Sequence, residues 1–128
     1  MPLKVLFFRT GSGNEPVREW LQEQSKKVRL TVGSDIRTVQ VKGPVIGMPL
    51  VRSLGGGLWE VRSTEGVEYR VFFFVLDGTM YLLHGIIKKT QRTAQGDLDL
   101  ARERMEAVKE KDKLEKAKAK AAVAKKKK

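Results

Sequence analysis

The sequence predicts an α+β fold: a small antiparallel sheet, two N-terminal helices packed on one of its faces, and a C-terminal helix. The main observation is three alternating apolar runs at about 58–63, 67–76 and 79–87, separated by Glu65-Gly66 and Asp77-Gly78. Alternating runs joined by such pairs indicate β-hairpins, so these runs form a three-stranded meander. The second observation is helical spacing of apolar residues before and after the meander, which predicts helices that cover it.

The chain begins with a predicted strand and a first helix. Residues 3–8 are rich in β-branched and aromatic side chains and favour a strand. Asn14 is a suitable N-cap for a helix of about 15–26, with Glu15 and Pro16 in its first turn. The apolar residues of this helix recur at helical spacing: Val17, Trp20 and Leu21.

A second helix is predicted through residues 34–39, and Gly43-Pro44 ends it because proline disfavours helical geometry in the residue before it. Its inward-facing candidates are Leu30, Ile36 and Val39. The last four residues of 47–54 are expected to form a further strand. Gly55-Gly56-Gly57 is interpreted as a turn and not as a phosphate-binding loop, because it precedes a strand instead of a helix.

The C-terminal region is predicted to be a helix that carries a narrow apolar stripe. The stripe recurs at i, i+3, i+7 and i+10, through Leu98, Ala101, Met105 and Val108. Beyond about Lys111 bulky apolar residues become rare. The sequence therefore divides into a domain of residues 1–110 and a Lys/Ala-rich tail, 111–128, which we expect to be frayed or disordered.

Composition narrows the possible functions. The 128 residues include 26 Lys+Arg and 15 Asp+Glu, a net charge of +11 that is shared between 1–96 and 97–128. A folded region that is itself basic indicates a polyanionic partner. The absence of cysteine and the single histidine argue against disulfides and against a metal centre, so no cofactor is expected. No apolar run approaches the ~20 residues of a membrane span, and we predict a cytoplasmic protein without membrane contact.

Period-two alternation sorts the meander into two faces. One face is apolar in all three strands and includes Tyr81 and Leu83 of the last strand, while Met80 and Leu82 of that strand are assigned to the other. That other face collects polar residues among apolar neighbours: Glu60, Arg62, Arg70, His84 and Lys88. We therefore expect the functional site on this second face.

Three motifs in sequence order carry a family resemblance: MPLVRSLGGGLWEVRS, YRVFFFV and LLHGIIKKTQRT. Together they resemble the HigB branch of the RelE/ParE toxins, over about residues 3–108. The resemblance implies a RelE-like fold and a phage-derived toxin of a type II toxin–antitoxin system. It further implies a metal-independent mRNA endonuclease that acts on the translating ribosome, inhibits translation and is neutralised by a cognate antitoxin of the helix-turn-helix DNA-binding type.

The resemblance also implies site residues. Its basic catalytic positions correspond here to Arg62 in LWEVR, Arg70 in YRV, and Lys88 and Lys89 after the last strand. Arg and Lys suit this role because they stabilise the charge that builds on a phosphate under attack by a 2′-hydroxyl. The predicted RNA-binding positions around them are Arg52, Gln91 and Arg92.

Proton transfer is less well defined by the sequence. Some relatives carry a tyrosine after the last strand, where this chain has Gln91 or Gln95, and neither amide can act as an acid or base. His84 or Glu60 could serve instead, and His84 is included among the predicted catalytic residues.

Alternatives remain open at this stage. Arg62 and Arg70 could have a structural role, in cross-strand ion pairs with Glu60 and Glu68. For the whole protein, the alternatives are a ParE-like inhibitor of DNA gyrase and a non-enzymatic RNA-binding module, for which an aromatic and basic sheet would suffice.

Overall fold

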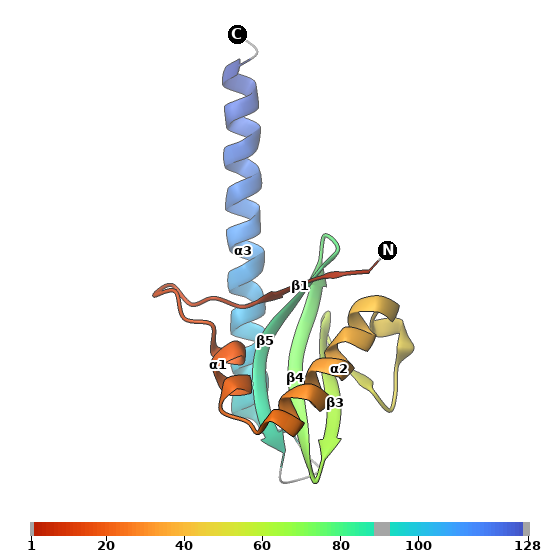
Figure 1. Cartoon of the computed structure of the whole chain (residues 1–128). Coiled ribbons are helices and arrows are strands. Elements are labelled where there is room, and N and C mark those ends of the chain that lie inside the picture. Colours follow the sequence, from red (N-terminus) through yellow and green to blue (C-terminus); the bar gives the residue numbers. More distant parts are fainter. Residues whose placement is uncertain (1, 89–92, 127–128) are drawn as a thin grey trace.

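The computed structural model describes residues 2–88 and 93–126 (Figure 1). Its elements in chain order are β1 (Lys4–Phe7), α1 (Pro16–Gln22), α2 (Lys26–Lys42), the short 3-10 helix η1 (Pro44–Ile46), β2 (Val51–Gly55), β3 (Leu58–Glu65), β4 (Val67–Leu76), β5 (Thr79–Lys88) and α3 (Gln95–Lys126). The five strands form one sheet in the order β1-β5-β4-β3-β2. The α+β class is confirmed.

The meander is formed by β3, β4 and β5 as predicted, with antiparallel pairing throughout. Its turns use positive φ angles, at Gly66 (76°) and at Asp77 and Gly78 (49° and 75°). The sheet as a whole is mixed and not purely antiparallel, because β1 pairs with β5 in parallel. The chain between them, which runs through α1, α2, η1 and strands β2 to β4, is long enough for the crossover that parallel neighbours need.

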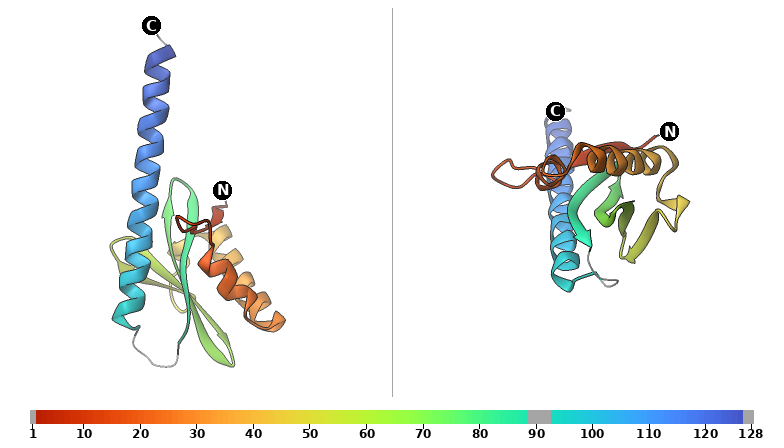
Figure 2. Two further views of the ribbon diagram at one scale, coloured as in Figure 1. Left: turned by 90° about the vertical axis from the view of Figure 1, so that its left-hand side faces the viewer. Right: turned by 60° about the horizontal axis from the view of Figure 1, so that its bottom comes forward.

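Helices α1 and α2 cover one face of the sheet (Figure 2). The side chain of Ser25 caps α2 by accepting a hydrogen bond from the Val28 amide, so α1 ends at Gln22 and the predicted single helix over 15–26 is wrong at its C-terminal end. The buried stripe of α2 is Val28, Val32, Ile36 and Val39. Leu30, predicted to face inward, lies off this stripe and is 64% exposed.

The central strand β4 is buried on both faces, from Tyr69 through Phe74. A bulge in its partner β5 changes the predicted faces, because Phe72 lies opposite His84 but Phe73 lies opposite Leu82. Alternation therefore restarts at the bulge, and the predicted faces of four β5 residues are wrong. Met80 and Leu82 pack with the helix α1 and α2 core, and Tyr81 and Leu83 pack on the opposite face.

Helix α3 covers part of this opposite face through the predicted stripe. Ala101 and Met105 are buried there, with Leu98 and Val108 packed beside them. Two arginines fix the helix to backbone carbonyls: Arg102 donates to Leu54 (2.8 Å) and Gly55 (3.2 Å), and Arg104 donates to Leu83 (2.9 Å).

The C-terminal region differs from the expectation. Residues 111–126 continue α3 as a helix, where frayed or disordered chain was predicted. Alanine, lysine and glutamate have high helix propensity, and Asp112 pairs with Lys116 one turn later at 3.0 Å. Low apolar content therefore did not prevent helix formation here.

Gly85 marks the tightest contact between α1 and the sheet, and it gives a stability test. A Cβ at this position would lie 2.4 Å from Cε3 of Trp20. We expect Gly85→Ala to lower the free energy of unfolding by about 1–3 kcal/mol, because α1 must shift to relieve the overlap. Urea denaturation followed by circular dichroism measures the change.

The matched control is Gly33→Ala in α2, where a Cβ meets nothing within 4 Å. It should raise stability by up to ~1 kcal/mol, because alanine is the better helix former. If Gly85→Ala and the parent protein had the same urea denaturation midpoint, the close packing of Trp20 on Gly85 would be refuted.

Candidate functional site

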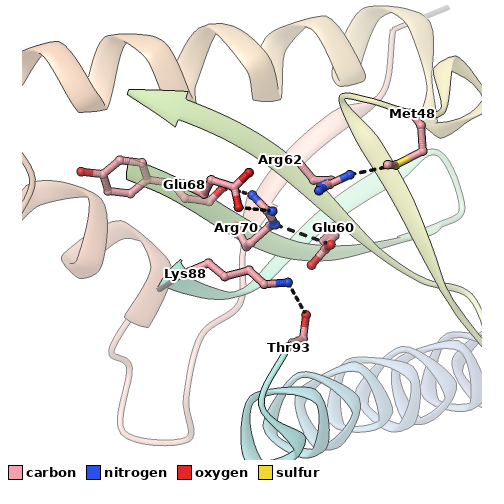
Figure 3. A network of polar contacts seen from close by, with 8 residues as sticks. Met48, Glu60, Arg62, Glu68, Arg70, Lys88 and Thr93 are labelled. Atoms are coloured by element: carbon pink, nitrogen blue, oxygen red, sulfur yellow. Dashed lines mark hydrogen bonds and ion pairs between the residues drawn. The ribbon is translucent and has the colours of Figure 1, made fainter. Parts of the chain in front are cut away.

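The second face of the sheet is only partly covered by α3, and charged side chains occupy the remainder. Strand pairing brings them together, because Arg62 lies opposite Arg70 and Glu68 lies opposite Lys88. Figure 3 shows Arg62, Arg70 and Lys88 gathered around Glu60. We refer to Arg62, Arg70 and Lys88 as the cationic cluster.

Glu60 and Arg70 form a buried ion pair at the centre of the cluster. Their side chains are 0% and 1% exposed, and Arg70 Nε lies 3.6 Å from Glu60 Oε1. Arg70 also donates to Glu68 Oε2 at 2.8 Å. The structural pairing that the sequence left open is therefore present for Arg70, whose charge compensates a buried carboxylate.

Arg62 has a different environment. It is half-buried, its Nη1 contacts Met48 Sδ at 3.2 Å, and its buried Nε has no hydrogen-bond partner in the part of the chain that the structure describes. Among those residues no carboxylate lies within ion-pair distance of it. Because β2 begins at Val51, opposite Val61, β3 is open to a shallow groove from Arg62 onward. Arg62 is therefore the arginine of the cluster whose donors are best placed for a ligand.

Lys88 completes the cluster near the start of α3. It is 8% exposed, and its Nζ donates to Thr93 Oγ1 at 3.3 Å. Burial lowers the pKa of its ammonium group, Arg70, Arg52 and Arg62 lower it further, and Glu60 opposes the shift. A lysine with a lowered pKa gives up its proton more readily than an ordinary surface lysine.

His84 shares this face but makes its polar contact elsewhere. Its Nε2 lies 2.7 Å from Asp97 Oδ1 in α3, and its ring stacks on Phe72 with centroids 5.7 Å apart. These contacts anchor α3 to the sheet. The structure does not bring His84 into the polar contacts of the cationic cluster.

The remaining predicted positions divide into two groups. Arg52 is exposed and lies opposite Glu60, so it belongs to the rim of the cluster. Lys89, Gln91 and Arg92 lie outside the described residues.

Two site residues were not identified from the sequence. Thr93 holds Lys88, and Met48 contacts Arg62 from a loop 14 residues earlier. No sequence pattern links either one to the strands. Over residues 2–88 and 93–126, no three His, Asp or Glu side chains gather where they could share a metal ion, and no helix has the length and apolar character needed to cross a membrane.

The ion pair predicts a strong effect on stability at Arg70. Arg70→Ala should lower the free energy of unfolding by about 3–5 kcal/mol, because it leaves Glu60 buried and uncompensated. The double variant Glu60→Gln/Arg70→Met should recover most of that loss, since neither charge remains. Urea denaturation of the single and double variants measures the coupling.

The control is Arg62→Ala, which breaks no ion pair and should cost less than about 1 kcal/mol. Equal losses for Arg62→Ala and Arg70→Ala would show that the buried pair contributes nothing distinctive.

Comparison with protein families identifies the chain. The family model described as "Phage derived protein Gp49-like (DUF891)" matches residues 19–106, from within α1 to the first half of α3. This range includes every residue of the cationic cluster. A comparison with curated proteins gives no match. The chain belongs to the Gp49-like family of phage-derived proteins, a family of RelE/HigB-type toxins.

Proposed function

We propose that the protein is the toxin of a type II toxin–antitoxin pair and cleaves mRNA on the translating ribosome. The observation that carries this proposal is Arg62, which lines a shallow groove beside the buried Arg70 and Lys88 and has no carboxylate within ion-pair distance among the described residues. A guanidinium with available donors suits a phosphate group. Membership of a phage-derived toxin family supports the same assignment.

The proposed chemistry is attack of an RNA 2′-hydroxyl on the adjacent phosphorus. The O2′–P bond forms, the P–O5′ bond breaks, and the products are a 2′,3′-cyclic phosphate and a 5′-hydroxyl. The 2′-hydroxyl proton passes to solvent, and the leaving 5′-oxygen takes a proton from Lys88. Charge builds on the nonbridging oxygens during this step, and fixed donors aimed at them lower the barrier.

The two arginines have separate roles in this proposal. Arg62 contacts the phosphate, because it lines the shallow groove and its charge is not engaged by a carboxylate among the described residues. Arg70 stays beneath the surface and neutralises the buried Glu60. Arg52 lies at the rim, where an exposed cation can bind the RNA backbone on one side of the cleaved bond.

A toxin of this kind requires a neutralising partner. We propose a cognate antitoxin of the helix-turn-helix DNA-binding type, which blocks the cationic cluster from mRNA. An acidic surface on that antitoxin would complement the cluster and its exposed rim.

Arg62→Ala is the direct test of the nuclease. We expect cleavage to fall by about 10²–10³-fold with little change in stability, because one donor to the transition-state phosphate is lost. Primer extension on mRNA in a defined translation reaction, with and without ribosomes, measures the cuts. Codon-related cuts should require ribosomes.

Arg37→Ala in α2 is the matched control, since it removes an exposed arginine on the opposite side of the sheet. It should cleave like the parent protein. If folded parent protein makes no cuts, the nuclease proposal fails, and inhibition of gyrase in a supercoiling assay would support the ParE-like alternative.

The lowered pKa of Lys88 predicts a pH dependence. The ratio kcat/KM should fall as pH rises through the Lys88 pKa, which lies below its usual value of 10.5, because the ammonium form is lost. Lys88→Arg should remove this falling limb, since arginine stays protonated. Cleavage rates measured from neutral pH up to about pH 10.5, the usual lysine value, give both profiles. An identical falling limb in Lys88→Arg would assign it to another group.

A further inference from the structure

The last part of α3 extends beyond the rest of the protein. Its final described contact with the domain joins Lys116 to Asp77, at the turn between β4 and β5, at 2.6 Å. Figures 1 and 2 show the helix projecting past this turn. Residues 117–126, here named the arm, add about 15 Å of helix.

The arm is uniformly basic. The sequence has six lysines and no acidic residue from Ala117 onward, whereas seven acidic residues lie between Asp97 and Glu115. Lys118 and Lys120 are two residues apart on a helix, so they lie on nearly opposite sides of it. Lys111 and Lys113, which are also exposed, extend these two lysine rows by two turns toward the domain.

The arm has no apolar stripe that would dock on a protein or a membrane. Its described side chains other than lysine are alanines and Val123. The nearest bulky apolar residue, Leu114, is nine residues earlier and lies on the opposite side of the helix. Dimerisation through helices and membrane-surface binding both need a continuous apolar face. The positive charge of the lysines is therefore the feature of the arm that indicates its partner, which we expect to be a polyanion.

The arm is far from the cationic cluster. Lys88 contacts Thr93 two residues before α3 begins, and the 32 residues of α3 span about 48 Å. A polyanion that occupies both regions must therefore extend over several tens of ångströms. In the proposed function, mRNA occupies the cationic cluster. The ribosomal RNA around that mRNA is a polyanion large enough to reach the arm as well.

We propose that the arm binds the phosphate backbone of ribosomal RNA and holds the protein on the ribosome while the cationic cluster engages mRNA. The proposal rests on the ribosome as the site of action, and it adds a second contact that cleavage chemistry does not require. Two linked contacts raise the overall affinity above that of either one. Small alanine side chains between the lysines allow the helix to approach the backbone closely.

The test compares ribosome binding by four full-length or truncated proteins, all carrying Arg62→Ala so that cleavage does not interfere. These are the parent chain, a truncation after Lys116, a Gln variant (Lys→Gln at 118, 120 and 125–128) and an Arg variant (Lys→Arg at the same positions). Cosedimentation with ribosomes over a series of salt concentrations gives the Kd and its salt dependence. Glutamine and arginine keep helix propensity close to that of lysine.

We expect the truncation and the Gln variant to bind ribosomes at least about tenfold more weakly at ~150 mM salt, and the slope of log K against log[salt] to decrease by about 2 to 5 units. The Arg variant should bind like the parent. Hydroxyl-radical footprints on ribosomal RNA should include positions that only the parent and the Arg variant protect. Thermal unfolding should be unchanged in all four proteins, because the arm makes no described contact with the domain.

Equal affinities and slopes for the parent and the Gln variant would overturn the proposal, as would absence of ribosome binding by the parent at low salt. Arm-dependent binding that is tighter to anionic vesicles or to duplex DNA than to ribosomes would assign the arm to another partner and also overturn it. Arm-dependent ribosome binding in this series, together with no mRNA cleavage by the folded protein that retains Arg62, would sustain the arm and refute the nuclease, so the two proposals fail separately.

Discussion

Burial of β4 on both faces is the constraint from which the rest of this fold follows. Six consecutive residues, Tyr69–Phe74, are buried, so both sides of this central strand must be covered. Helices α1 and α2 cover one face with a valine-rich stripe, and α3 covers the other with Ala101 and Met105. A single helix is narrower than the sheet, and the uncovered part of the second face is where the charged residues lie.

The charged residues beside α3 differ in their structural roles. Glu60 and Arg70 are almost completely enclosed and compensate each other's charge at 3.6 Å, and Arg70 also pairs with Glu68. Both carboxylate oxygens of Glu60 and Nε of Arg70 have no hydrogen-bond partner among the described residues. A buried ion pair adds little net stability, but removal of one partner is costly, so this pair constrains substitution more than it strengthens the fold. Arg62 is not part of this ion pair, because its guanidinium contacts the sulfur of Met48 and the residue lines a shallow groove. Of these two neighbouring arginines, Arg70 is therefore part of a buried ion pair, whereas Arg62 is not.

The sequence predicted the features that depend on local pattern. The Glu65-Gly66 turn and the alternation of β3 and β4 placed Arg62 and Arg70 side by side, and helical spacing identified the buried stripe of α3. The features it missed depend on tertiary context. A bulge in β5 reversed the faces of Met80 through Leu83, which no alternation rule anticipates. The Asp97 partner of His84 comes from a different element, and only the packing of α3 against the sheet reveals it.

The distinction between the two arginines also lay beyond sequence pattern. Their faces and neighbours are equivalent in the alternation, and only the start of β2 at Val51 and the course of the loop at Met48 leave Arg62 at an open edge. The helical tail is a different kind of miss. Composition indicated that it lacks a core of its own, and the structure continues α3 as a helix to Lys126, with Lys116 in contact with Asp77.

The charge asymmetry of the chain has a kinetic consequence. Six lysines and no acidic residue follow Lys116 in the sequence, so this segment supplies six of the net charge of +11, and α3 is about 48 Å long. A molecule with this distribution experiences a torque in the field of an extended polyanion and turns its C-terminal end toward it before contact. The encounter complex would then form through that end, with an association rate that falls steeply as ionic strength rises. Under the proposed contact with ribosomal RNA, the association rate would depend on charges far from Glu60, so it could change in evolution without altering the sheet.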